Sequence, residues 1–91
     1  MRVKELDICE IVTMPKDKKE GLLYVSRKYE LAIHLCACGC RGEAVTPLDV
    51  GSGWILTQGP NGPTLRPSIG HQQWPCKSHY YITDGKIVDL N

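Results

Sequence analysis

The stretch His34-Leu35-Cys36-Ala37-Cys38-Gly39-Cys40 carries three of the five cysteines of the chain within a few residues. A second short stretch, Pro75-Cys76-Lys77-Ser78-His79, adds a fourth cysteine and a histidine. Thiolate and imidazole are the ligands that tetrahedral zinc prefers, and a set of three cysteines and one histidine fills all four of its positions. The two stretches therefore predict one metal site, built from two loops that are far apart along the chain.

Five side chains compete for the four ligand positions, namely Cys36, Cys38, Cys40, Cys76 and His79. The Cys-x-x-His half is the firmer one, because Pro75 fixes the entry to its loop. In the first stretch Cys38 stands directly before a glycine, as in zinc knuckles, and it ranks ahead of Cys36 and Cys40. The spacing leaves open which four of the five residues bind the metal.

Two other chemistries fit parts of this pattern. A [2Fe–2S] cluster also accepts four such ligands, although a Rieske centre has histidine where Cys38 stands. A zinc enzyme needs an open coordination position and a group that handles protons, and Glu43 is the nearest acid to the cysteines. We interpret Glu43 as a surface residue, His34 as a partly buried histidine near the thiolates and His71 as exposed. The pattern favours a structural site and leaves catalysis undecided, with the balance against an enzyme.

Length, charge and cysteine usage limit the class of protein. With 91 residues the chain is predicted to form a single metal-binding domain, residues 1–91, with a thin core. A net charge of +1 and a pI of about 7.6 give no reason to expect nucleic-acid binding. We find no signal peptide and no apolar run long enough for a membrane span. An odd number of cysteines, clustered for metal binding, predicts a cytoplasmic protein with reduced thiols.

Outside the two loops the sequence reads as short β-strands separated by turn residues. Strands are expected at residues 7–13, 22–26, 30–36, 43–46, 53–58 and 64–66, and residues 68–74 are expected to form a loop. Asp84-Gly85 joins two β-rich runs, residues 79–83 and 86–90, and predicts a hairpin with a type I′ turn. The expected fold is mostly β, a small antiparallel domain of zinc-ribbon or Rieske-like type with little or no helix.

Several motifs resemble a family of small bacterial proteins of unknown function. They are GLLYVS at 21–26, HLCACGCRG at 34–42, LRPSIG at 65–70 and PCKSHYYI at 75–82. The resemblance extends from about residue 21 to 88. Members of that family are often encoded beside bacterial ubiquitin-like proteins and their E1-like, E2-like and JAB-type peptidase companions. Arg41 is a departure, because members often have glycine there.

The resemblance implies a role in a ubiquitin-like conjugation pathway, but no particular reaction. Together with the metal site it suggests a small zinc-binding accessory protein that contacts a ubiquitin-like, E1-like or E2-like partner. The alternatives are a [2Fe–2S] electron-transfer protein of Rieske-like type and a zinc or thiol enzyme. Neither nucleic acid nor membrane is an expected partner.

Overall fold

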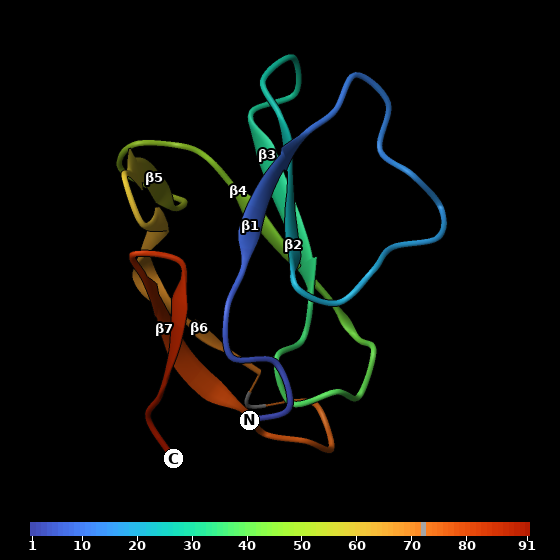
Figure 1. Cartoon of the computed structure of the whole chain (residues 1–91), viewed down its shortest axis with the longest axis vertical. Helices are drawn as coiled ribbons and strands as arrows, with labels where there is room; N and C mark the ends of the chain where they lie inside the picture. Colours follow the sequence, from blue (N-terminus) through green and yellow to red (C-terminus); the bar gives the residue numbers. More distant parts are fainter. Residues whose placement is uncertain (72) are drawn as a thin grey trace.

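The computed structural model describes residues 1–71 and 73–91, which form two four-stranded sheets (Figure 1). The first sheet has the order β1-β2-β3-β4, with β1 at Asp7–Glu10, β2 at Leu22–Ser26, β3 at Leu31–Leu35 and β4 at Glu43–Pro47. The second has the order β5-β6-β7-β8, with β5 at Ile55–Gly59, β6 at Gly62–Gly70, β7 at His79–Thr83 and β8 at Lys86–Asp89. The described residues contain no helix, so none could cross a membrane. The predicted mostly-β fold class with little or no helix is confirmed.

The strands pair antiparallel with one exception, the pair β1 and β2. These two strands run parallel, in the register Asp7↔Leu22, so the expected antiparallel order is wrong for this pair. Parallel neighbours need a connection that carries the chain back along the sheet. Residues 11–21 provide it as the wide loop in Figure 1, and β1 accordingly ends at Glu10, earlier than predicted.

The turns of the second sheet follow from their residue types. Asp84 and Gly85 both have positive φ, 51° and 79°, which confirms the type I′ turn between β7 and β8. The prediction that the strand beginning at Thr64 stops at Arg66 is wrong, because β6 continues to Gly70. Pairing with β5 ends at Arg66, and the register with β7 shifts before Ile69. Pro67 therefore lies in an irregular part of the ladder, where its missing N–H does no harm.

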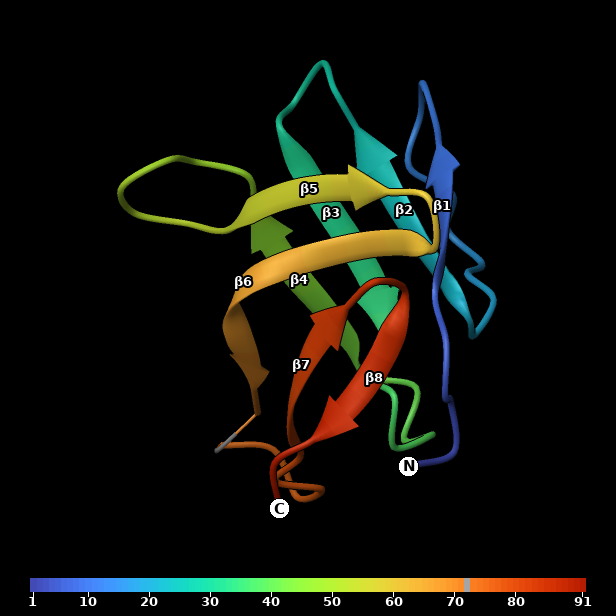
Figure 2. The ribbon, with the colours of Figure 1, turned by 60° about the vertical axis from the view of Figure 1, so that its left-hand side comes forward.

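The core lies between the two sheets, whose strands cross in Figure 2. Inward-facing positions alternate along the strands, as expected for sheets with one buried face. The fully or nearly buried apolar residues come from both sheets and include Leu23, Val25, Ala32, Leu65, Ile69, Tyr80 and Ile82. The loop after β3 and the loop before β7 lie at the same end of the molecule, near both chain termini (Figures 1 and 2).

Candidate metal centre and serine–histidine pair

The two loops bring four thiols together, those of Cys36, Cys38, Cys40 and Cys76. Their sulfur atoms all lie within 4.8 Å of one another, so the group could hold a metal ion. The Sγ atom of Cys36 is 3.4 Å from that of Cys38, and the Sγ atoms of Cys40 and Cys76 are 3.8 Å apart. Zinc–sulfur bonds of about 2.3 Å place the sulfurs of a tetrahedral site about 3.8 Å apart. The four cysteines thus have the spacing that one tetrahedral ion requires.

The first loop is a tight turn at the end of β3. The N–H of Cys36 donates to the carbonyl of Gly42 at 2.8 Å, and the N–H of Gly39 donates to that of Cys36 at 3.1 Å. Gly39 and Arg41 have positive φ, 96° and 67°, a backbone conformation that glycine adopts most readily. Gly42 is needed for space, because a Cβ atom there would lie 2.6 Å from the Trp74 ring.

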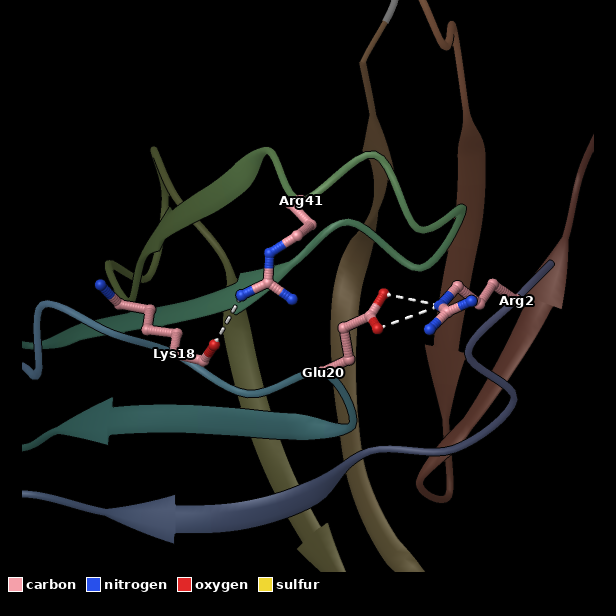
Figure 3. Close-up of polar contacts among 4 residues, drawn as sticks. All are labelled: Arg2, Lys18, Glu20 and Arg41. Atoms are coloured by element: carbon pink, nitrogen blue, oxygen red, sulfur yellow. Dashed lines mark hydrogen bonds and ion pairs between the residues drawn. The ribbon is translucent and has the colours of Figure 1, made fainter.

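The N-terminal segment and the wide loop of residues 11–21 contact the cysteine turn from outside. Val3 donates its N–H to the carbonyl of Ala37 at 2.9 Å. The side chain of Arg2 crosses Gly39 and pairs with Glu20 at 3.0 Å (Figure 3). Arg41 donates to the carbonyl of Lys18 at 3.1 Å (Figure 3). Ion pairs this exposed contribute little free energy, so the contacts mainly fix the position of the turn.

Ser78 and His71 form the inner wall of the cysteine cluster. The Oγ of Ser78 lies 3.0 Å from the Sγ of Cys36 and 3.4 Å from that of Cys76. The Nδ1 of His71 lies 3.4 Å from the Cys36 sulfur and 3.1 Å from the Ser78 hydroxyl. The prediction that His71 is exposed is wrong, because its ring is buried and stacks on Trp74 with centroids 3.8 Å apart. Such polar neighbours orient thiolate ligands and hold them in place.

The thiols of the cluster have different proton affinities. The hydroxyl of Ser78 lowers the pKa of Cys76 to about 6. Burial raises the pKa of Cys38 to about 12, and it also raises that of Cys36. A divalent cation held by the four sulfurs would supply positive charge and so favour the deprotonated thiols.

A second buried layer lies under the cysteine turn. The Nε2 of His34 is 2.8 Å from the hydroxyl of Tyr80, and this hydroxyl accepts the N–H of Ala37 at 3.3 Å. Burial, followed by the nearby His71, lowers the pKa of His34 to about 4, and burial raises the pKa of Tyr80. Among the described residues the Nδ1 of His34 has no hydrogen-bond partner. Tyr80 therefore ties the cysteine turn to the second sheet.

His79, a predicted metal ligand, lies outside the four-thiol group. Successive side chains of a strand point to opposite faces of the sheet. Ser78 and Tyr80 are buried on the core side, so His79 points to the outer face. The candidate ligand set in the structure is therefore four cysteines, in place of three cysteines and His79.

On this outer face His79 meets a serine. Its Nε2 lies 2.8 Å from the Oγ of Ser68, and both side chains are half-buried. His79 starts β7 opposite Gly70 of β6, so Ser68, two residues earlier on the same strand, reaches it diagonally. A histidine nitrogen at this distance can take the hydroxyl proton and make serine a nucleophile. Among the described residues, no carboxylate forms an ion pair with the His79 ring.

The sequence reading missed Ser68, although it lies in the LRPSIG motif. A second serine–histidine contact, between Ser78 and His71, is buried, and the Ser78 hydroxyl in it also contacts the Cys36 sulfur. The contact between Ser68 and His79 becomes visible only in the structure, because the sequence spacing of residues 68 and 79 does not indicate it. The register shift between Leu65 and Ile69 also depends on pairing with β7 and is not visible in the sequence.

Comparison with known proteins gives one family. The model of a family described as "Bacterial ubiquitination-like system serine protease (BubE)" matches residues 11–90. No curated protein and no solved structure matches the chain.

Proposed function

The chain belongs to this family of the bacterial ubiquitination-like system, and we propose that it acts there as a serine protease through Ser68 and His79. One observation supports this assignment above the others. The Ser68 hydroxyl and the His79 Nε2 are 2.8 Å apart on a half-buried face of the second sheet. The contact of Ser78 with His71 is a weaker candidate, because Ser78 is only 2% exposed and contacts two cysteine sulfurs.

The proposed reaction is acyl transfer through a covalent intermediate. The Oγ of Ser68 attacks the carbonyl carbon of the scissile bond while its proton passes to His79 Nε2. The tetrahedral intermediate collapses, the C–N bond breaks, and the amine leaves with the proton held by His79. Water then adds to the acyl-serine ester by the same route, which releases the acid and restores the hydroxyl.

We propose that the four cysteines hold one structural Zn²⁺. Four thiolates fill a tetrahedral shell and leave no open position for a reacting water. A [2Fe–2S] cluster divides its ligands between two irons, which fits less well with four sulfurs all within 4.8 Å. In this reading the metal would fix the loop that leads into β7 and would take no part in catalysis.

Membership in the family implies protein partners from the ubiquitin-like pathway. A protease of such a system acts on polypeptide, and we propose a ubiquitin-like protein or its conjugate as the substrate. Contacts with E1-like or E2-like proteins would then serve delivery of this substrate. An accessory role without catalysis is the alternative if the serine proves unreactive.

A fluorophosphonate probe tests the nucleophile without knowledge of the substrate. We expect zinc-loaded protein to be labelled at a single residue, identified as Ser68 by peptide mass spectrometry. Ser68→Ala and His79→Ala should reduce labelling at least a hundredfold, because each removes one half of the pair. Ser78→Ala, measured with excess zinc, is the matched control and should keep its labelling.

The result that would contradict the assignment is equally specific. Labelling that persists in Ser68→Ala, or that moves with Ser78, would exclude Ser68 as the nucleophile. Absence of labelling in folded, metal-loaded protein would favour the accessory role.

A further inference from the structure

Two open strand edges line a groove that includes Gly70, the residue that pairs with His79 across β6 and β7. The groove has a volume of about 480 Å³, which is within the usual range of ligand sites. One side is β4 and the other is the end of β6, with two tryptophans between them. The lining residues that matter here are Glu43–Thr46, Trp54, Ile69, Gly70 and Trp74. In Figure 2 the last part of β6 bends away from β5, which leaves this edge without a strand neighbour.

The outer edge of β4 presents unused backbone groups. The N–H of Cys36 donates to the carbonyl of Gly42, and bonded and non-bonded pairs alternate along an antiparallel ladder. In the register of β3 and β4, the backbone groups of Glu43 and Val45 therefore point away from β3, toward the groove. No hydrogen bond to these groups is made by any other residue that the structure describes. Val45 is also 51% exposed.

The end of β6 presents a similar edge. The N–H of His71 donates to the carbonyl of Ser78 at 2.9 Å, which fixes the phase of the β6–β7 ladder. The N–H and C=O of Gly70 then point away from β7, to the groove side. The carbonyl of Ser68 faces the same way, because it accepts a bond from Trp54 Nε1 at 3.4 Å.

Gly70 connects the groove with the pair. It lines the groove, and a Cβ atom on it would lie 3.6 Å from the Cδ2 of His79. A larger side chain at this position would extend beside the His79 ring. Glycine therefore leaves room for a substrate backbone to approach the reacting atoms.

We propose that this groove binds an extended segment of the protein substrate as an added strand and so delivers a peptide bond to Ser68. The inference rests on the proposed function and specifies how its substrate is held. Free backbone groups on both sides suit a main chain better than a compact ligand. The four residues of β4 along the groove span about 13 Å, the length of roughly four extended residues. Trp54, Trp74 and Val45 provide apolar contacts for its side chains.

A pair of phosphonate probes tests this binding mode separately from the nucleophile. Both carry the same diphenyl phosphonate of glycine, one with an acetyl cap and the other with acetyl-Val-Ala-Val. We expect the peptidyl probe to label Ser68 at least tenfold faster. Methylation of its backbone nitrogens one at a time should remove this advantage at alternate positions, because only every second N–H of an added strand faces a partner.

A matched pair of variants tests the groove itself. Val45→Pro removes an outward N–H of β4, at the kind of edge position where proline is tolerated. Val45→Ala shortens the same side chain and keeps the N–H. The proline variant should lose most of the tenfold advantage with the acetyl-capped probe unaffected, whereas the alanine variant should keep it. If the proline variant does not fold, the methylated probes make the same test on the unaltered protein.

Each outcome decides a different point. If the acetyl-capped probe labels Ser68 but the peptide adds no speed, the groove proposal is overturned and the nucleophile stands. Equal rates for all methylated probes would overturn it as well. If neither probe labels Ser68, the proposed function and the groove proposal both fall.

Discussion

The cysteine cluster and the Ser68–His79 pair lie in neighbouring parts of the same fold, but they are held in different ways. The cluster joins the two sheets, since Cys36 follows β3 and Cys76 precedes β7. The pair lies within the second sheet, on strands that the ladder at Gly70↔His79 already aligns. The geometry of the cysteine cluster would therefore depend on a bound metal ion, whereas that of the Ser68–His79 pair depends on the backbone pairing of β6 and β7.

This difference separates stability from chemistry in the molecule. The core is small and contains no phenylalanine, so the proposed metal cross-link between the sheets would contribute a large share of the folding free energy. The serine and histidine are half-buried on an outer face and contribute little to it. Substitutions in the two sites should therefore have opposite effects on folding and on reactivity.

The largest expected effect is loss of the metal. Structural zinc sites contribute on the order of 10 kcal/mol to folding, which is comparable with the whole stability of a domain. Cys76→Ser should abolish stoichiometric zinc and unfold the chain at 25 °C. The same should follow when a strong chelator removes zinc from the unaltered protein. Elemental analysis measures the zinc content, and circular dichroism measures unfolding.

Cys9→Ser is the matched control for this experiment. Cys9 is a half-buried cysteine of β1 outside the four-thiol group. The Cys9→Ser variant should keep its full zinc content and a melting temperature close to that of the unaltered protein. If Cys76→Ser also kept its metal and its fold, the cluster would not be a structural metal site.

The cysteine cluster was predictable because three of its four thiols lie close together in sequence and the fourth lies in a similar short motif. Cys36, Cys38 and Cys40 lie within one turn, and three thiols so close together in a short loop are typical of a shared metal ion. The position of His79 outside the four-thiol group was not predictable from Cys-x-x-His spacing. The start of β7 at residue 79 decides which face its ring takes, and this depends on pairing with a strand elsewhere in the chain.

The contact of Ser68 could not be predicted, because it depends on strand pairing and not on local sequence. Turn chemistry at Asp84-Gly85 is local, so its hairpin was predicted correctly. The continuation of β6 past Pro67 depends on β7, which is tertiary information. Because residues 68–74 read as a loop, the contact between Ser68 and His79 on paired strands could not be inferred. The family resemblance included Ser68 but assigned it no role.

Tyr80 allows the coupling between the sites to be measured. Its hydroxyl contacts His34 at 2.8 Å and the N–H of Ala37 at 3.3 Å, both on the cluster side. Tyr80→Phe leaves these buried groups unpaired, which should cost about 1–3 kcal/mol. Urea unfolding of the zinc-loaded protein measures the change. Tyr29→Phe, at a residue that is 68% exposed, should change stability by less than about 0.5 kcal/mol.

The effect of Tyr80→Phe on reactivity sharpens the comparison. Its neighbour His79 faces the other side of the sheet, so probe labelling of folded Tyr80→Phe should match that of the unaltered protein. A large loss of labelling at full zinc occupancy would show that the two sites are coupled through β7.

A smaller effect is expected at Ser78, whose hydroxyl contacts two of the four thiols. Ser78→Ala removes a hydroxyl 3.0 Å from the Cys36 sulfur and 3.4 Å from that of Cys76. Loss of such a supporting group typically weakens metal binding about tenfold or more. Competition with a chromophoric chelator measures the affinity. Ser52→Ala, on an exposed turn, should leave it unchanged.

The smallest effect on stability should accompany the complete loss of reactivity. Ser68→Ala removes a half-buried hydroxyl whose contact is His79, and His79 can bond water instead. Its free energy of unfolding should change by less than about 0.5 kcal/mol, because surface substitutions of this kind rarely cost more. Zinc affinity should be unchanged, since Ser68 makes no contact with the four thiols. A gain in stability would fit the expectation that reactive groups are held at some cost to folding. A loss above about 2 kcal/mol, the size expected for a core defect, would instead assign Ser68 a structural role, and the hydrogen bond to His79 would then be part of the framework of the second sheet.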